Sequence, residues 1–246
     1  MYRGRTFNRE RVYVCGDYLD GDIYPVFQKP GERRKRCRPT SEIQKKLNQR
    51  NAAKRLTRIV HMNFTSRDLA LHLTYDPAHT PESAEDALRI VQNYLRTLKR
   101  RYRKIGVEFK YILSTEKGGR VHHHLIISGG LDRDTLESLW GRGYANSKRL
   151  QFGDEGVSGL THYITKDDAS YKRWSGSRNL VQPEAATSDG KLTMDETEEL
   201  AEAVEDGLGY EWFEERYPDF ELVSCECIRN SMNRGAYIHF EMRRRR

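Results

Sequence analysis

The sequence predicts an α+β fold: an antiparallel central sheet with helices packed on one face, an N-terminal hairpin and a C-terminal α/β appendage. Runs with strand character, alternating or largely apolar, occur at 69–75, 107–116, 121–128 and 144–152. Segments with helical character lie between or after them, at 80–104, 132–140 and 156–168. The resulting order, strand-helix-strand-strand-helix-strand, is typical of an antiparallel sheet with helices on one side.

The N-terminal segment predicts a β-hairpin. Residues 12–15 and 22–27 have strand character, and Asp20-Gly21 between them is a turn signal. Pro25 has no backbone N–H, so its strand is expected at the edge of a sheet. Nothing in this hairpin indicates chemistry.

A dense run of basic residues follows at 31–58 and predicts contact with DNA. Ser41 is expected to cap a helix there, with a buried stripe that includes Leu47 and Leu56. Positive charge before the helix and on its other faces suits a phosphate backbone. The residues predicted to bind DNA are Arg33, Arg34, Lys35, Arg36, Lys45, Lys46, Arg50 and Lys54.

The next helix is predicted to start at Thr80 and Pro81, a cap residue followed by proline at the first helical position. Apolar residues then recur at helical spacing as far as Tyr102, which indicates a core-facing stripe. Gly106 is expected to end the helix.

The C-terminal third is divided by charge. Between Glu184 and Glu226 there are fifteen acidic residues and two basic ones, within a protein of formal net charge +7. An acidic helix is expected at 190–206 and a final hairpin at 220–228 and 236–242. The predicted organisation is a hairpin and basic helix at 1–60, a central domain at 61–183 and an appendage at 184–246. The positive remainder favours a polyanionic partner.

Composition excludes several classes of protein. Mean hydropathy is −0.85 and 32% of residues are charged, so no membrane-spanning segment or signal peptide is expected. The four cysteines form no Cys-x2-Cys pair, which favours reduced thiols over a structural zinc site. The sequence has no phosphate loop of the ATPase type, so no fused helicase is expected.

The residues around a Gly-Gly turn at 118–119 predict a metal site. His122 and His124 lie two apart on a strand and therefore point to the same face. Pairing across the turn can bring Glu116 to that face. Two imidazoles and a carboxylate suit a catalytic divalent cation, Mn²⁺ or Mg²⁺, and ligand identity alone leaves zinc open. His123 points the other way and is expected in the core.

Taken together, these motifs resemble the HUH endonuclease superfamily, and more narrowly the rolling-circle replication initiators of the filamentous-phage gene II type. The resemblance rests on Glu116, His122-x-His124 and the downstream run Tyr163-Ile164-Thr165-Lys166. The upstream segment 71–75, Leu-His-Leu-Thr-Tyr, is similar to the first motif of that family. The resemblance spans roughly 64–183 and implies an RRM-like nuclease fold.

The resemblance also implies an activity. Tyr163 would be the nucleophile that nicks single-stranded origin DNA, leaving a 5′-phosphotyrosine, and Lys166 would assist one helical turn later. The implied partners are origin DNA and a host helicase and polymerase, in the cytoplasm of a bacterial host. Tyr171 is a weaker candidate nucleophile because it lacks a lysine three residues on.

Two other readings stay open. A single-tyrosine transposase or a relaxase would use the same scaffold, although relaxases usually place the tyrosine before the histidines. A non-catalytic sheet of the RNA-recognition type would instead need exposed aromatic residues on its central strands.

Overall fold

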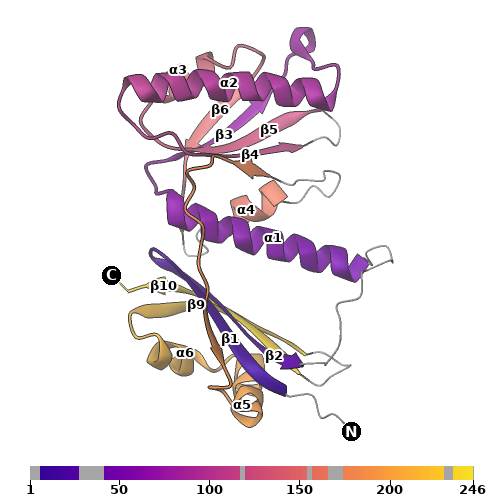
Figure 1. The fold of residues 1–246 in the computed structure, drawn as a ribbon, viewed down its shortest axis with the longest axis vertical. Helices are drawn as coiled ribbons and strands as arrows, with labels where there is room; N and C mark the ends of the chain where they lie inside the picture. The colour runs from indigo at the N-terminus through magenta and orange to yellow at the C-terminus, as the bar shows by residue number, and fades with distance from the viewer. Residues whose placement is uncertain are drawn as a thin grey trace. The chain divides into compact units, whose positions relative to one another are not determined.

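The computed structural model describes residues 6–27, 42–116, 120–153, 157–165, 174–229 and 235–245, without the side chains of 42–44 and 162–163. The chain forms two compact units, each built around one five-stranded antiparallel sheet (Figure 1). Unit 1 comprises Met1–Thr40 and Gln182–Arg246, and unit 2 comprises Ser41–Val181.

The sheet of unit 2 has the strand order β6-β3-β5-β4-β7. Its strands are β3 (Leu69–Thr74), β4 (Tyr111–Glu116), β5 (His122–Ile127), β6 (Ala145–Arg149) and β7 (Ser175–Gly176). The helices of this unit are α1 (Glu42–Asn63), α2 (Ala84–Lys104), α3 (Arg133–Ser138) and α4 (Ser158–Thr165), with a short 3-10 turn η1 (Pro77–His79). The α+β class with an antiparallel sheet is therefore confirmed.

One face of this sheet packs against α2 and α3. Alternation along β3 and β5 directs Leu71, Leu73 and Leu125 to that face, where they are buried with Leu98 of α2 and Leu136 of α3. The main core of unit 2 lies here, and it covers this face of the strands.

The opposite face has two regions. At its apolar region Ile112 and Ile126 are paired across β4 and β5 and pack in a cluster with α1 and α4. The remaining positions on this face, along the same strands, carry polar and titratable side chains. The helices of unit 2 thus pack on both faces of the sheet, whereas the sequence indicated only one.

Two helices differ in detail from the sequence-based expectation. Helix α2 begins at Ala84, because the Ser83 side chain caps it by accepting a hydrogen bond from the Asp86 amide. The expected start at Thr80 is therefore wrong, and Pro81 precedes the helix. In α1 the buried residues include Leu56 and Ile59, whereas Leu47 is exposed.

Unit 1 has the strand order β8-β1-β2-β10-β9. Its elements are β1 (Thr6–Cys15), β2 (Tyr18–Phe27), β8 (Ala186–Asp189), α5 (Met194–Glu205), α6 (Tyr210–Arg216), β9 (Phe220–Arg229) and β10 (Ala236–Arg244). The expected hairpin of β9 and β10 is confirmed. Leu200 of α5 and Phe213 of α6 belong to one buried cluster with Ile238 and Phe240 of β10.

The turn of the N-terminal hairpin lies at Gly16-Asp17, so the turn expected at Asp20-Gly21 is wrong. Gly16 has φ +66°, which favours glycine. Gly21 lies inside β2, where a Cβ atom would be 2.1 Å from the Phe240 ring. This glycine therefore makes room for a core aromatic ring.

The units differ from the domain boundaries expected from the sequence. Helix α1 belongs to unit 2, and the strands β1 and β2 share a sheet with β9 and β10. Pairing of β2 with β10, for example Ile23 with Ile238, joins residues more than two hundred positions apart. Local sequence patterns carry no information on such pairing.

None of the helices in the described part of the chain combines the length and the apolar character that crossing a bilayer would require.

Candidate metal centre

Strands β4 and β5 bring the three predicted ligands together. Glu116 is the direct cross-strand partner of His122, and Ser114 is the partner of His124. The Glu116 Oε2 atom lies 2.8 Å from His122 Nε2 and 3.8 Å from His124 Nε2. The sequence-based hypothesis that these residues converge agrees with this geometry.

A third histidine completes the cluster. His72 of β3 is the direct cross-strand partner of His124, so its side chain points to the same face. The His72 ring lies 5.1 Å from the His122 ring and 4.8 Å from the His124 ring, and the latter pair is stacked. One ring nitrogen from each of the three histidines lies within 4.8 Å of the others.

The sequence analysis missed His72 as a ligand. The motif around it was noted only for its resemblance, yet a signal was present: His72 alternates with Leu71 and Leu73 on a predicted strand. Such a residue faces away from the core. Which strand lies beside β5, and in which register, was the missing information.

The cluster favours neutral imidazoles. Burial, followed by the nearby His72 and His122, lowers the pKa of His124 to about 4. Burial and then His122 lower the pKa of His72, with a smaller opposing effect from Glu116. A metal binds the neutral form of imidazole, so these two groups need not lose a proton near pH 7.

The contacts of His122 test whether the residues fit a cation. Its Nδ1 lies 2.9 Å from the Arg120 carbonyl, which accepts hydrogen bonds only, so Nδ1 carries a proton. In the neutral ring Nε2 then presents a lone pair to the Glu116 carboxylate, 2.8 Å away. Two acceptors at this distance require either a second proton or a cation near both. The donor set therefore fits a bound cation.

His123 lies on the opposite face and has no solvent exposure. Its Nε2 is 2.7 Å from the Tyr75 hydroxyl and its Nδ1 is 2.9 Å from the Thr115 hydroxyl. The expectation of a packed core histidine is confirmed.

Helix α4 lies against the face that bears the histidines. The Ser114 hydroxyl donates to the Ile164 carbonyl at 3.1 Å, and Ser114 is directly opposite His124. The Thr57 and Thr161 hydroxyls, 2.6 Å apart, tie α4 to α1. Tyr163 belongs to this helix, but its side chain and all of Lys166 lie outside the described residues.

The residues predicted to bind DNA fall into two groups. Arg33, Arg34, Lys35 and Arg36 lie outside the described residues. In α1, Lys45 and Lys46 are exposed, Arg50 is half-buried and Lys54 is buried, with 7% exposure. Lys45 and Lys46 are thus the members of this set with side chains open to a phosphate backbone.

A second group of metal-ligating residue types occurs in unit 1, where Asp20, Asp22 and His239 are buried. His239 Nδ1 lies 2.9 Å from the Gly21 carbonyl and 2.9 Å from the Asp22 carboxylate. One nitrogen of this histidine is therefore used within the sheet, which favours a structural network.

The fold and the cluster define unit 2 as an α+β domain with a three-histidine, one-carboxylate site on an antiparallel sheet. Residues 68–168, about two fifths of the chain, match the model of a family described as replication-associated proteins of the ORF2 and gene II protein type. The resemblance to initiators of the gene II type is thereby confirmed over this segment, and the match supports a role in replication initiation. His72, Glu116, His122, His124, Tyr163 and Lys166 all lie within it. Comparisons with curated proteins and with solved structures gave no match.

Proposed function

We propose that this protein initiates rolling-circle replication by nicking single-stranded origin DNA and later rejoining it in a metal-dependent reaction. The observation that carries the proposal is the convergence of His72, His122 and His124 with Glu116. This convergence occurs inside a segment that matches replication-associated proteins.

The proposed ligands are the three imidazoles, with Glu116 as an oxygen donor beside them. A divalent cation bound there would polarise the scissile phosphate and neutralise part of its charge. Nitrogen-rich donor sets suit Mn²⁺ or zinc better than Mg²⁺, which prefers oxygen ligands and water. His72 therefore shifts the expected preference towards Mn²⁺ over Mg²⁺.

Tyr163 is the proposed nucleophile. Its hydroxyl oxygen would bond to phosphorus, the bond from phosphorus to the 3′-oxygen would break, and the phenolic proton would end on that 3′-oxygen. The products are a free 3′-OH and a 5′-phosphotyrosine, which keeps the phosphodiester energy for rejoining. The contact between Ser114 and Ile164 supports this role, because it brings the turn of α4 that contains Tyr163 to the histidine face. Lys166 would stabilise developing negative charge.

The exposed Lys45 and Lys46 on α1, together with the basic run that precedes this helix, are proposed to hold the DNA backbone. Because the sequence has no phosphate loop, strand separation would come from a host helicase, and extension of the 3′-OH from a host polymerase. The proposed setting is the cytoplasm of a bacterial host.

A cleavage assay tests this proposal. Single-stranded origin DNA is incubated with Mn²⁺ and either the wild-type chain, Tyr163→Phe, His72→Ala or His79→Ala. We expect loss of nicking in the first two variants and retention in His79→Ala, whose histidine pairs with Asp76 outside the cluster. Nicking by Tyr163→Phe at the wild-type rate would contradict the assigned nucleophile. DNA binding without nicking by any of these proteins would favour the non-catalytic alternative.

A further inference from the structure

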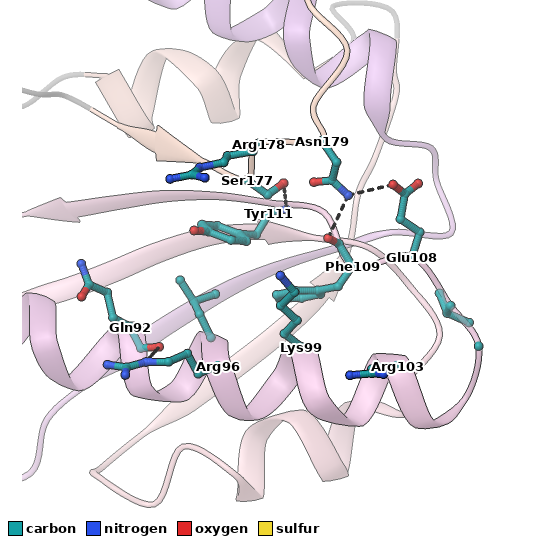
Figure 2. A pocket seen from close by; sticks show the side chains of 13 residues that line it. Gln92, Arg96, Lys99, Arg103, Glu108, Phe109, Tyr111, Ser177, Arg178 and Asn179 are labelled. Atoms are coloured by element: carbon teal, nitrogen blue, oxygen red, sulfur yellow. Dashed lines mark hydrogen bonds between the residues drawn. The ribbon is translucent and has the colours of Figure 1, made fainter.

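A cavity of about 970 Å³ lies within unit 2, between α2 and the edge of the sheet formed by β4 and the segment after β7 (Figure 2). Its wall includes Arg96, Lys99, Arg103, Phe109, Tyr111 and Arg178. Tyr111 alternates with Ile112 along β4 and packs with the α2-side core, so the cavity and the histidine cluster use opposite faces of the sheet.

Four cations border this cavity. Arg96, Lys99 and Arg103 are spaced three and four residues apart and form a row on one face of α2, and Arg178 approaches from the sheet edge (Figure 2). All four are exposed, and none has a carboxylate partner among the residues that the structure describes. Their charge is therefore available to an anionic ligand.

Glu108 supplies the carboxylate of the lining, and its charge is partly engaged. The Asn179 amide donates to Glu108 at 2.8 Å, and the Lys110 ammonium lies 3.8 Å from it. The net character of the cavity is accordingly positive.

An aromatic wall faces these cations. Tyr111 is half-buried, and the rings of Phe109 and Tyr102 follow behind it at centroid distances of 5.7 Å and 4.7 Å. Backbone and side-chain hydrogen bonds of 2.9 Å and 3.1 Å join Tyr111 to Ser177 and fix the strand edge. The cavity thus combines a rigid aromatic surface with a row of cations.

We propose that this cavity is a second nucleic-acid site that binds a segment of single-stranded DNA. Phosphates would lie along the row of Arg96, Lys99 and Arg103, and an unpaired base would stack on Tyr111. A positively charged groove lined by aromatic rings is the usual arrangement for sequence-tolerant binding of single strands. Paired bases of a duplex remain stacked in the helix, so a duplex would reach the cations without the aromatic wall.

Strand cleavage and metal binding are not needed for this interaction. Binding can be measured with a chelator present and with Tyr163→Phe as the parent protein, so that no cleavage occurs. Failure of the proposed nicking activity would then leave the result on this cavity unaffected, and the reverse also holds.

The first test compares two triple variants of the full chain. Arg96→Gln/Lys99→Gln/Arg103→Gln removes the cavity row, and Arg100→Gln/Arg101→Gln/Lys104→Gln removes three exposed charges elsewhere on α2. For labelled single-stranded DNA we expect the cavity variant to bind at least ~10-fold more weakly and to lose about two units of the salt-dependence slope. The control variant should remain within about twofold to threefold of the parent. Equal losses in both variants would overturn the proposal.

The second test locates the base. A strand that contains 5-iododeoxyuridine is irradiated on the protein, and the linked peptide is identified by mass spectrometry. We expect crosslinks at Tyr111, with ~10-fold weaker binding by Tyr111→Leu and near-parental binding by Tyr111→Phe. Crosslinks confined to α1, or equal binding of duplex and single strands by both Tyr111 variants, would overturn the proposal.

Discussion

His72 and His124 are direct partners across β3 and β5, and their rings stack with centroids 4.8 Å apart. Neutral rings tolerate this approach, whereas two imidazolium ions would repel each other. Burial, together with the neighbouring histidines, lowers the pKa of both. This pair therefore forms a ready site for a cation, and His122 with Glu116 extends it on one side.

His72→Ala is expected to weaken Mn²⁺ binding by at least ~10-fold, because it removes one of three converging nitrogen donors. Isothermal titration calorimetry on the full chain measures this change. His79→Ala is the matched control, since that histidine pairs with Asp76 and lies outside the cluster. Unchanged Mn²⁺ affinity in His72→Ala would remove this residue from the proposed site.

Much of unit 2 is predictable from local patterns. The strand positions of His122 and Glu116 follow from alternation and a Gly-Gly turn, and their convergence needs only the pairing of neighbouring strands. His72 depends on β3 lying beside β5, a contact between segments about fifty residues apart. Gly21 misled the sequence analysis because glycine marks turns and also close packing. Only the long-range contact with Phe240 distinguishes the two.

His123→Ala should destabilise unit 2 by about 2–4 kcal/mol, because it leaves a cavity and removes the partner of the buried Tyr75 hydroxyl. Hydrogen exchange of β3 and β5 amides reports the change. His122→Ala is the comparison, and we expect it to reduce metal binding with a smaller effect on stability. Equal protection of these strands in His123→Ala and in the wild type would contradict the structural role of His123.

Gly21→Ala is expected to destabilise unit 1 by about 1–3 kcal/mol through overpacking. The new methyl group would overlap the Phe240 ring, which has no solvent exposure and packs 4.7 Å from the Phe213 ring. Urea unfolding followed by hydrogen exchange in β2 and β10 measures the loss. Gly159→Ala is the control, since a Cβ atom there meets nothing within 4 Å. Partial recovery in Gly21→Ala/Phe240→Leu would identify the ring as the cause.

Glu10 makes the stability of unit 1 sensitive to acid. Burial alone would raise the pKa of Glu10, but hydrogen bonds from Arg216 and Tyr217 outweigh burial and lower it below the usual 4.5. The stabilisation is therefore complete above that value and is lost as the pH falls through the lowered pKa. Hydrogen exchange of β1 amides between about pH 7 and about pH 3 should show this loss.

Glu10→Gln should cost about 1.5–3 kcal/mol at neutral pH and should flatten the acid dependence. Asp189→Asn breaks the exposed pair with Arg9 in the same unit and should cost at most ~1 kcal/mol. Identical acid profiles for Glu10→Gln and the wild type would show that another group controls the transition.

Mapping the covalent adduct tests the central claim most directly. Single-stranded origin DNA labelled at its 3′ end is incubated with the wild-type chain and Mn²⁺, and the labelled peptide is sequenced by mass spectrometry. The label is expected on Tyr163, and it should be absent from His72→Ala and from reactions with chelator. A label on Tyr171 or another tyrosine, or no adduct from a protein shown to bind both Mn²⁺ and the DNA, would contradict the proposed strand transfer.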